Sequence, residues 1–274
     1  MTVLRVALIQ TRTPASQTAA LDHTAPLIEQ AALGGANFVL TPEGSNFLQK
    51  SRPAFEQTVS DPEEDIFVDG VRALARRHSI HILIGSALVR GEDGRFANRS
   101  LMVDPAGAVI ATYDKIHMFD VDLPTGERHR ESNVYAPGER AVMVDTPFGG
   151  VGLTICYDIR FPGLYRRLAI AGASILTVPA AFTRPTGAAH WEVLLRARAI
   201  ENGAFVLAPA QGGTHEDGRA TWGRSMAIAP WGEVIAASDG DEPGVIFADL
   251  DLDAVGAARS AIPSLANGRE FTGP

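Results

Sequence analysis

The sequence predicts an α/β protein built as a four-layer α-β-β-α sandwich of two similar halves. Apolar, β-branched runs alternate with segments of helical spacing along the chain, as in α/β proteins. The order of these segments occurs twice, and residues 100–114 match residues 225–239 at seven of fifteen positions. Because each half must bury the second face of its sheet, we expect the two sheets to pack together with the helices outside.

The first half begins with a near-continuous apolar run at residues 3–9, which is typical of a strand covered on both faces. Helical spacing follows as far as Gly34-Gly35, and Ser60 with Glu63 has the pattern of a second helix start. In chain order we expect strand 3–9, helix 16–33, strand 37–40, helix 60–77, strand 81–89, a turn at 91–94, and a hairpin of strands 100–103 and 109–113. Residues 116–140 lack periodicity, and a loop of that length in a compact domain is usually functional.

The second half repeats this order. We expect strand 151–155, helix 164–171, strand 174–178, helix 188–202, strand 204–209 and a hairpin through Pro230-Trp231-Gly232. The pattern therefore predicts a single domain over residues 1–274, with a first half of about 1–140 and a second half of about 141–250. The weakly patterned residues 251–274 are expected to wrap the surface or a partner subunit.

Composition argues against several classes of protein. The 24 basic and 32 acidic residues give a net charge of −8, which is unfavourable for binding nucleic acid or an anionic membrane. The apolar runs fall short of the ~18 residues of a membrane span, and residues 3–9 are too short for a signal peptide, so the expected compartment is the cytoplasm. Cys156 is the only cysteine, so it forms no internal disulfide, and no Cys/His cluster has zinc-like spacing.

Three side chains that can carry chemistry follow predicted strands. Glu43 follows strand 37–40, Lys115 follows the first hairpin, and Cys156 follows strand 151–155. Taken singly, each has an ordinary structural interpretation, as a loop carboxylate, a surface lysine and a small buried thiol. Together they supply what a nucleophilic thiol requires, a base and a neighbouring cation, at strand ends where α/β folds place their sites.

Histidine is the usual base for a cysteine nucleophile, so two histidines need weighing. His117 lies two residues after Lys115, and His190 begins an amphipathic segment. A hydrogen-bonded structural role is the more common one for both, yet spacing alone leaves a Cys–His pair open. Arg160 has two interpretations as well, because it can clamp a substrate carboxylate or form a structural salt bridge at a helix start.

Three blocks of the chain resemble the signature blocks of the nitrilase superfamily of carbon–nitrogen hydrolases. They are Thr41-Pro42-Glu43, YDKIHMFD at residues 113–120 and GLTICYDIRFP at residues 152–162, in the family's order. The similarity extends from Val6 to about Asp249. It implies the α-β-β-α sandwich that the internal repeat predicts independently.

The resemblance also narrows the branch of the family. Tyr157-Asp158 after the cysteine resembles the amidases, whereas nitrilases tend to have Trp-Glu there. Residues 182–202 resemble the group of deaminated glutathione amidases and ω-amidases, the former more closely.

By this resemblance, the catalytic glutamate, lysine and cysteine of the family correspond to Glu43, Lys115 and Cys156. A second glutamate, in the loop between lysine and cysteine, corresponds best to Glu131, with Glu127 as the alternative. The resemblance implies no metal and no organic cofactor. The expected substrate contacts are Tyr157, Arg160, Phe182 and Thr183.

The implied reaction is hydrolysis of a primary amide to a carboxylic acid and ammonia through a thioester on Cys156. The expected partner is a small carboxylate-bearing amide of the deaminated glutathione or ω-amide type. Alternative functions are an N-carbamoyl amino acid hydrolase, an aliphatic amidase or a nitrilase on the same scaffold, or a non-catalytic binding protein. Family members commonly pair through helices beside the site, so we expect a homodimer or a larger homo-oligomer.

Overall fold

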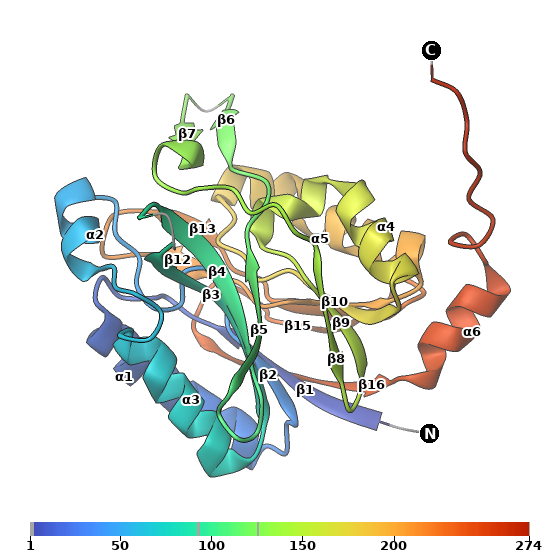
Figure 1. Cartoon of the computed structure of the whole chain (residues 1–274), viewed down its shortest axis with the longest axis horizontal. Helices are drawn as coiled ribbons and strands as arrows, with labels where there is room; N and C mark the ends of the chain where they lie inside the picture. Colours follow the sequence, from blue (N-terminus) through green and yellow to red (C-terminus); the bar gives the residue numbers. More distant parts are fainter. Residues whose placement is uncertain (1–2, 92–93, 125, 274) are drawn as a thin grey trace.

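Two six-stranded sheets form the centre of the molecule, and helices cover their outer faces (Figure 1). The computed structural model describes residues 3–91, 94–124 and 126–273. The turn expected at 91–94 therefore includes two residues outside the described part. The layers follow the order α1 and α3, first sheet, second sheet, α4 and α5, which confirms the expected sandwich.

The first sheet has the strand order β16-β1-β2-β3-β4-β5. Strands β1, β2 and β3 are parallel, while β16, β4 and β5 are antiparallel to their neighbours. The strands of this sheet are β1 (Val3–Gln10), β2 (Phe38–Leu40), β3 (His81–Arg90), β4 (Phe96–Val103), β5 (Val109–Asp114) and β16 (Gly244–Asp251). Helices α1 (Gln17–Leu33) and α3 (Ile66–His78) cover its outer face.

The second sheet repeats this plan with the order β15-β14-β11-β10-β9-β8. Strands β9, β10 and β11 are parallel, and the other three are antiparallel. Its members are β8 (Val142–Thr146), β9 (Gly149–Leu153), β10 (Ala173–Thr177), β11 (Phe205–Ala208), β14 (Met226–Ile228) and β15 (Val234–Ala237), with α4 (Pro162–Ile170) and α5 (Arg184–Asn202) outside. The twofold order of segments in the sequence thus corresponds to two sheets of one topology.

Alternation along β1 shows how the layers are held together. Val6 and Leu8 belong to the large apolar cluster shared with the second sheet, whereas Ala7 and Ile9 belong to the cluster under α1 and α3. Successive side chains of a strand point to opposite faces, so one continuous apolar run supplies both interfaces.

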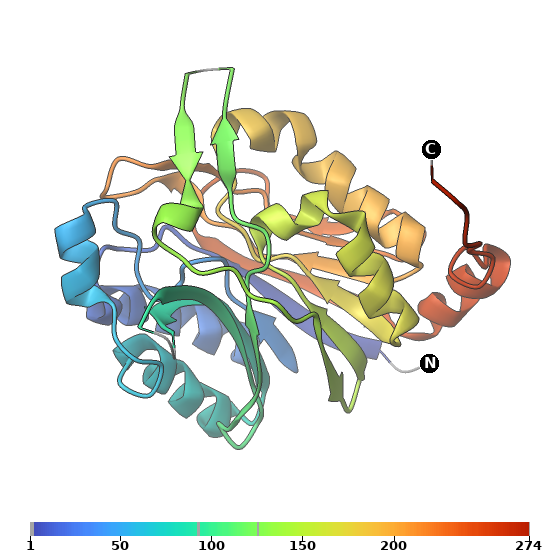
Figure 2. The ribbon, with the colours of Figure 1, turned by 45° about the horizontal axis from the view of Figure 1, so that its top comes forward.

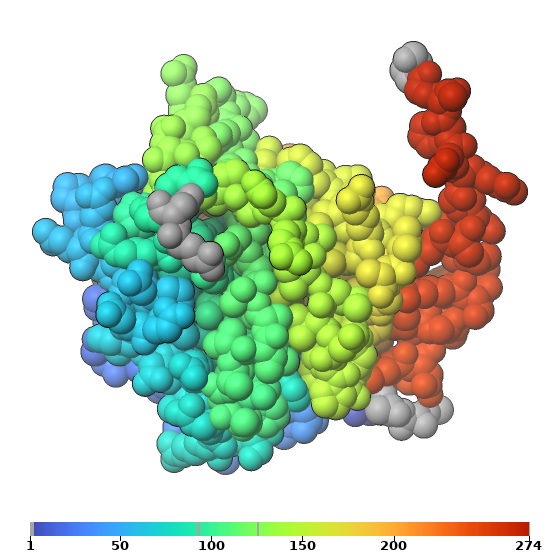
Figure 3. All heavy atoms as spheres, viewed as in Figure 1, coloured from blue at the N-terminus to red at the C-terminus, as the bar shows by residue number. Residues whose placement is uncertain are grey.

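Several elements differ from the sequence expectation. Helix α3 starts after Asp65, whose carboxylate accepts the Val68 N–H, while Ser60 instead accepts a hydrogen bond from Gln17. Elements that were not expected from the sequence include α2 (Arg52–Thr58), β8, β16 and α6 (Asp253–Ala261), together with two small hairpins. Helix α6 lies in the segment expected to be a weakly patterned tail, and the residues after it project from the body (Figure 3).

Two small hairpins complete the structure on the side where the parallel strands end. One consists of β6 (Asp120–Asp122) and β7 (Arg128–Arg130) and stands out from the body (Figure 2). The other consists of β12 (Gly212–Thr214) and β13 (Ala220–Trp222). The first lies within the aperiodic loop of residues 116–140.

Candidate active site

Cys156 sits in a strained turn directly after β9. Its φ of +49° is in the left-handed region that non-glycine residues rarely occupy. Its N–H donates to Pro179 O at 2.9 Å, and the short 3₁₀ helix η2 (Cys156–Arg160) begins here. The Asp158 carboxylate accepts the Ile155 N–H at 2.9 Å, so the turn is held from both sides. This geometry directs a nucleophile away from the sheet end, as strained turns at functional sites do.

Lys115 lies between two carboxylates in the interior. Its Nζ is 2.9 Å from Glu43 Oε1 and 2.8 Å from Glu131 Oε2, and its side chain is only 2% exposed. Glu43 comes from the loop after β2 and Lys115 from the end of β5, so the sheet topology brings them together across 72 positions. The three charges leave the buried cluster with a net charge of −1.

The second Glu43 oxygen faces the other half of the molecule. Glu43 Oε2 accepts the Ala181 N–H at 2.9 Å, and the Cys156 thiol forms a hydrogen bond with the Glu43 carboxylate. The structure therefore brings Glu43, Lys115 and Cys156 into one cluster. The base beside the thiol is a carboxylate from the first half.

The pKa values give the charge state of this cluster. Burial raises the pKa of Glu43, but the Lys115 ammonium and hydrogen bonds from Cys156, Lys115 and Asn98 outweigh it, and the pKa lies below its ordinary value. Burial lowers the pKa of Lys115, yet Glu131 and Glu43 raise it well above its ordinary value. The resting state thus has a carboxylate beside an ammonium.

The thiol behaves differently from the sequence expectation. A neighbouring cation was expected to activate it, but burial and the Glu43 carboxylate raise the pKa of Cys156 well above its ordinary value, against the effect of Lys115. The free site therefore holds a protonated thiol hydrogen-bonded to an ionised base. A thiolate can form only as the proton moves to Glu43.

Glu131 is the second glutamate that the structure places in the cluster. It begins the 3₁₀ helix η1 (Glu131–Asn133), and its Oε2 also accepts the Phe119 N–H at 2.6 Å. Glu127, the alternative, lies on the projecting hairpin with its carboxylate 3.6 Å from His129 Nε2. Of the two glutamates, Glu131 is the one that contacts Lys115.

Asn98 is a member of the cluster that sequence reasoning missed. Its Nδ2 donates to Glu43 Oε1 at 2.9 Å and lies 3.4 Å from Glu131 Oε1, while its Oδ1 accepts from Ser86 Oγ. Asn98 thus positions both carboxylates. The signal available in the sequence is weak, because Asn98 is one of three adjacent polar residues (98–100) in β4, and its side chain is only 3% exposed in the fold.

The two histidines have partners other than the thiol. His117 Nδ1 is 2.7 Å from Asp158 Oδ1, and its ring stacks on Phe161 at 3.5 Å between centroids. His190 Nδ1 is 3.2 Å from Arg160. Neither of these contacts is with Cys156, so the Cys–His pair that the spacing left open does not form through them. The two histidines instead contact Asp158, Phe161 and Arg160.

The four residues expected to contact the substrate differ in how far they are already engaged with other side chains. Arg160 lies over the Tyr157 and Phe182 rings, at 5.9 and 5.6 Å from the centroids, and touches His190 instead of a carboxylate. Its guanidinium is thus framed by aromatic rings. Phe182 is buried against Trp191, and the Thr183 hydroxyl is paired with Thr186 at 2.8 Å.

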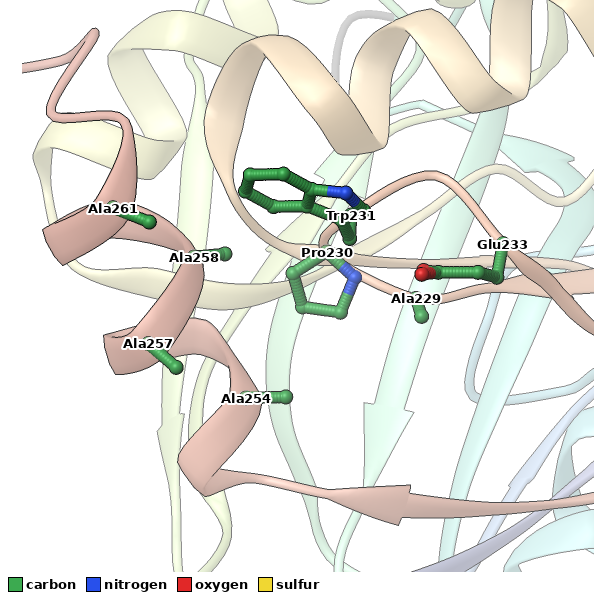
Figure 4. Close-up of a pocket in the computed structure, with 8 residues that line it drawn as sticks. All are labelled: Ala229, Pro230, Trp231, Glu233, Ala254, Ala257, Ala258 and Ala261. Carbon is green, nitrogen blue, oxygen red and sulfur yellow. The ribbon is translucent and has the colours of Figure 1, made fainter.

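A separate hollow lies outside this cluster. It measures about 350 Å³ and is lined by the turn before β15 and by alanines of α6, with Trp231 and Glu233 at its edge (Figure 4). It holds no nucleophile.

Over the described ranges, no group of three or more His, Cys, Asp or Glu side chains is placed to hold a metal ion. Among those same residues, no helix is long and apolar enough to cross a membrane.

Comparison with known proteins identifies the family of the chain. The carbon–nitrogen hydrolase family profile matches residues 5–260. A deaminated glutathione amidase of Synechocystis sp. (strain PCC 6803 / GT-S) is 41% identical over 267 residues, which cover 96% of each chain.

Two solved structures extend the comparison to the fold. The C. elegans NitFhit protein superimposes with a TM-score of 0.91 at 34% identity, over 97% of this chain and 65% of that one. A glutamate-to-glutamine mutant amidase of Nesterenkonia sp. AN1, with the acetamide moiety of fluoroacetamide added covalently at its active-site cysteine, has a TM-score of 0.80 at 26% identity. That match covers 97% of this chain and 94% of the amidase.

The chain belongs to the carbon–nitrogen hydrolase family and is a carbon–nitrogen hydrolase. The expected family and fold are confirmed.

Proposed function

We propose that this carbon–nitrogen hydrolase is an amidase that uses Cys156 as nucleophile, Glu43 as general acid and base, and Lys115 as the cation of the oxyanion site. The observation that carries the proposal is the buried cluster in which Glu43 contacts both the thiol and the Lys115 ammonium. A deaminated glutathione amidase at 41% identity supports the amide as the bond that is cleaved.

The first step is attack on the amide carbonyl. The Cys156 proton moves to Glu43 as sulfur forms a bond to the carbonyl carbon, and the carbonyl electron pair moves to oxygen. Because the pKa of the free thiol is raised, the thiolate develops only when an electrophile accepts its charge. Lys115 and the Tyr157 N–H stabilise the oxyanion, and a positioned donor of this kind contributes about 10²–10³ in kcat.

The second step releases the amine and the acid. The C–N bond breaks as Glu43 returns its proton to the leaving nitrogen, and a thioester remains on Cys156. Glu43 then takes a proton from water, which attacks the thioester and frees the carboxylic acid and the thiol. Glu131 keeps Lys115 in place through two short contacts of 2.8 and 2.9 Å.

The substrate we propose carries a carboxylate on its acyl part, bound by Arg160. Arginine binds carboxylates with two parallel hydrogen bonds, and this guanidinium is held between aromatic rings beside Cys156. Two amides fit, an ω-amide such as α-ketoglutaramate and deaminated glutathione. The first has a primary amide and releases ammonia, whereas the amide of the second is secondary and releases the dipeptide Cys-Gly.

The test is product release with the Cys156→Ala variant. We expect the wild-type enzyme to release ammonia or Cys-Gly and the variant to release neither. Mass spectrometry during turnover of a slow amide should show an acyl adduct on Cys156. Retained activity of the variant would remove Cys156 from the mechanism, and a folded variant is verified by an unchanged circular dichroism spectrum.

A substrate panel separates this function from other reactions of the scaffold. Carbon dioxide release from N-carbamoyl amino acids would mark a carbamoylase, and hydrolysis of nitriles or of short aliphatic amides would mark a nitrilase or an aliphatic amidase. Inertness toward every member of the panel would support a non-catalytic binding protein.

We also propose that the enzyme is a cytoplasmic homodimer or larger homo-oligomer. Three large apolar side chains are exposed close together, Val193 (68%) and Ile200 (53%) on α5 and Trp231 (56%) on the adjoining turn. The Gly232 backbone lies against Ile200, which joins the turn to the helix. Such a patch is typical of an interface. Sedimentation analysis tests the assembly, and a charged Ile200→Glu variant should dissociate it.

A further inference from the structure

Arg219 carries a partly exposed guanidinium on the hairpin that is anchored at the candidate site. Within the described residues its side chain donates no hydrogen bond, and it is about one-third exposed (33%). Its Nη2 lies 3.3 Å from Asp217 Oδ2, yet that oxygen is buried and has no hydrogen-bond partner. Apart from this ion pair with Asp217, the Nε and Nη1 donors of the Arg219 fork make no hydrogen bond to the described residues, so they are available to a ligand.

The turn that carries Arg219 is fixed at its base. The Arg219 N–H donates to Asp217 Oδ1 at 2.9 Å, and the His215 N–H donates to Arg219 O at 2.8 Å. The His215 ring is buried and bonds Thr221 Oγ1 at 2.7 Å. A fixed backbone that carries a fork engaged on one side only is suited to preorganised recognition of an anion.

Both ends of this hairpin are attached to the candidate site. Before β12, Gln211 Nε2 donates to Glu43 O at 3.0 Å. At the end of β13, the Trp222 N–H donates to Phe182 O at 2.9 Å. The hairpin that carries Arg219 is therefore anchored at its base to Glu43 and to Phe182.

Tyr135 connects Arg219 with the charged cluster from the other side. Its N–H donates to Glu131 O at 3.0 Å, and its ring packs edge-on against Phe55. Arg219, Glu131, Glu43 and Lys115 are all close enough to Tyr135 that their charges act on its pKa. Tyr135 is thus near both Arg219 and the catalytic cluster.

The position of Arg219 matters because of where the leaving group of the substrate must lie. The departing nitrogen must lie beside Glu43, because Glu43 is its proton donor when the C–N bond breaks. The buried cluster has a net charge of −1 and repels anions, so a substrate with carboxylates needs compensating cations. In the proposed function Arg160 binds the carboxylate of the acyl part, and Arg219 stands on the hairpin anchored at Glu43.

We propose that Arg219 determines specificity by binding a carboxylate on the leaving amine of the substrate. The inference rests on the proposed amidase function and makes it narrower, because it favours an amide with a carboxylate at each end over a primary ω-amide. Deaminated glutathione has this form, since the α-keto acid carboxylate and the glycine carboxylate lie on opposite sides of the scissile amide.

The experiment uses three amides that share one acyl group. They are α-ketoglutaramate, deaminated glutathione, and the analogue of deaminated glutathione in which the glycine carboxylate is capped as an amide. For Arg219→Gln we expect kcat/KM to fall about 10- to 100-fold with deaminated glutathione, the range of a lost charge-assisted hydrogen bond, and less than about threefold with the other two. Arg219→Lys should be intermediate, because it keeps the charge and loses the fork.

The matched control is Arg77→Gln, which makes the same charge change on α3 far from the hairpin and should leave all three values unchanged. An equal loss with all three amides would place Arg219 on the acyl side or in a structural role, and no loss would remove it from recognition. Both results overturn the inference but leave the proposed function intact. A wild-type enzyme inactive toward all three amides would overturn the proposed function, and the inference with it.

Discussion

In the first half Thr11 follows β1 at the register position that Cys156 occupies after β9 in the second half. The pairings show this, because Val6 aligns with Phe38 and Val151 with Ile175, and the same number of residues leads from each pair to the turn. Thr11 Oγ1 donates to Gln211 Oε1 at 3.0 Å. One backbone position therefore carries a structural hydrogen bond in one half and the candidate nucleophile in the other.

The charged residues are divided just as unequally. Glu43 has Ala180 as its counterpart after β10, and Lys115 has Gly240 after the second hairpin. The first half thus supplies the base and the cation, and the second supplies the thiol. The repeated sheet therefore provides equivalent strand ends, while the chemistry depends on a few side chains that only one half carries.

The largest effect is expected where the halves differ most. Lys115→Gln leaves Glu43 and Glu131 facing each other in the interior without their cation. We expect kcat to fall about 10³-fold or more, and the free energy of unfolding to fall by about 3–5 kcal/mol, the range for breaking a buried ion pair. Kinetics and urea unfolding measure both.

The counterpart position provides the control for Lys115. A Cβ on Gly240 meets open space, so Gly240→Ala should change stability by less than about 0.5 kcal/mol and leave kcat unchanged. Equal effects at the two positions would contradict the division between the halves.

A smaller effect is expected at Asp158, which holds the turn of the nucleophile. Its carboxylate accepts hydrogen bonds from the Ile155 N–H, the Tyr113 hydroxyl at 2.6 Å and His117. Asp158→Asn turns one acceptor into a donor, so we expect kcat to fall by up to about 100-fold, with KM changed less than about threefold. A fall in KM and kcat together would show that Asp158 acts on substrate binding.

At Thr11 the effect should be on stability alone. Thr11→Val removes the hydroxyl donor to Gln211, and we expect the free energy of unfolding to fall by about 1–2 kcal/mol while kcat stays within about threefold. Thermal unfolding and steady-state kinetics check the two values. A loss of activity comparable to that of Cys156→Ala would mean that the two positions are functionally equivalent after all.

The smallest effects concern pH. The pKa of Glu43 is below its usual 4.5, so its ionised form stabilises the fold above pH 4.5, and that stability is lost as pH falls through the lower folded value. The pKa of Lys115 is above its usual 10.5, so its contribution is present below pH 10.5 and is lost as pH rises through the higher folded value. We expect a plateau of kcat/KM between these limits. An acid limb centred above pH 4.5 would contradict the assignment of Glu43 as base.

Much of the fold follows from local pattern. The apolar runs and the repeated hairpin predict both sheets, because buried strands and turns depend on residue types that are close together in the sequence. Local pattern does not predict strand β16 or helix α6. The pairing of β16 with β1 joins residues more than 230 positions apart, and α6 is rich in small residues and has no strong apolar stripe.

The candidate site divides in the same way. Glu43, Lys115 and Cys156 were found because each follows a predicted strand and matches a family block. Asn98 and Arg219 belong to no such block, and their proximity to the cluster arises only from pairing between distant strands. The raised pKa of Cys156 was not foreseen either, since it depends on burial that no local pattern reports.

The pairing of β1 with β16 has a consequence for synthesis on the ribosome. Strand β1 is made more than 230 residues before its partner at Gly244–Asp251, so one edge of the first sheet stays open while the residues between them are produced. An unpaired edge with Val6 and Leu8 beside it is a template for wrong strand pairing. Completion of this sheet therefore couples both halves into one late, long-range folding event.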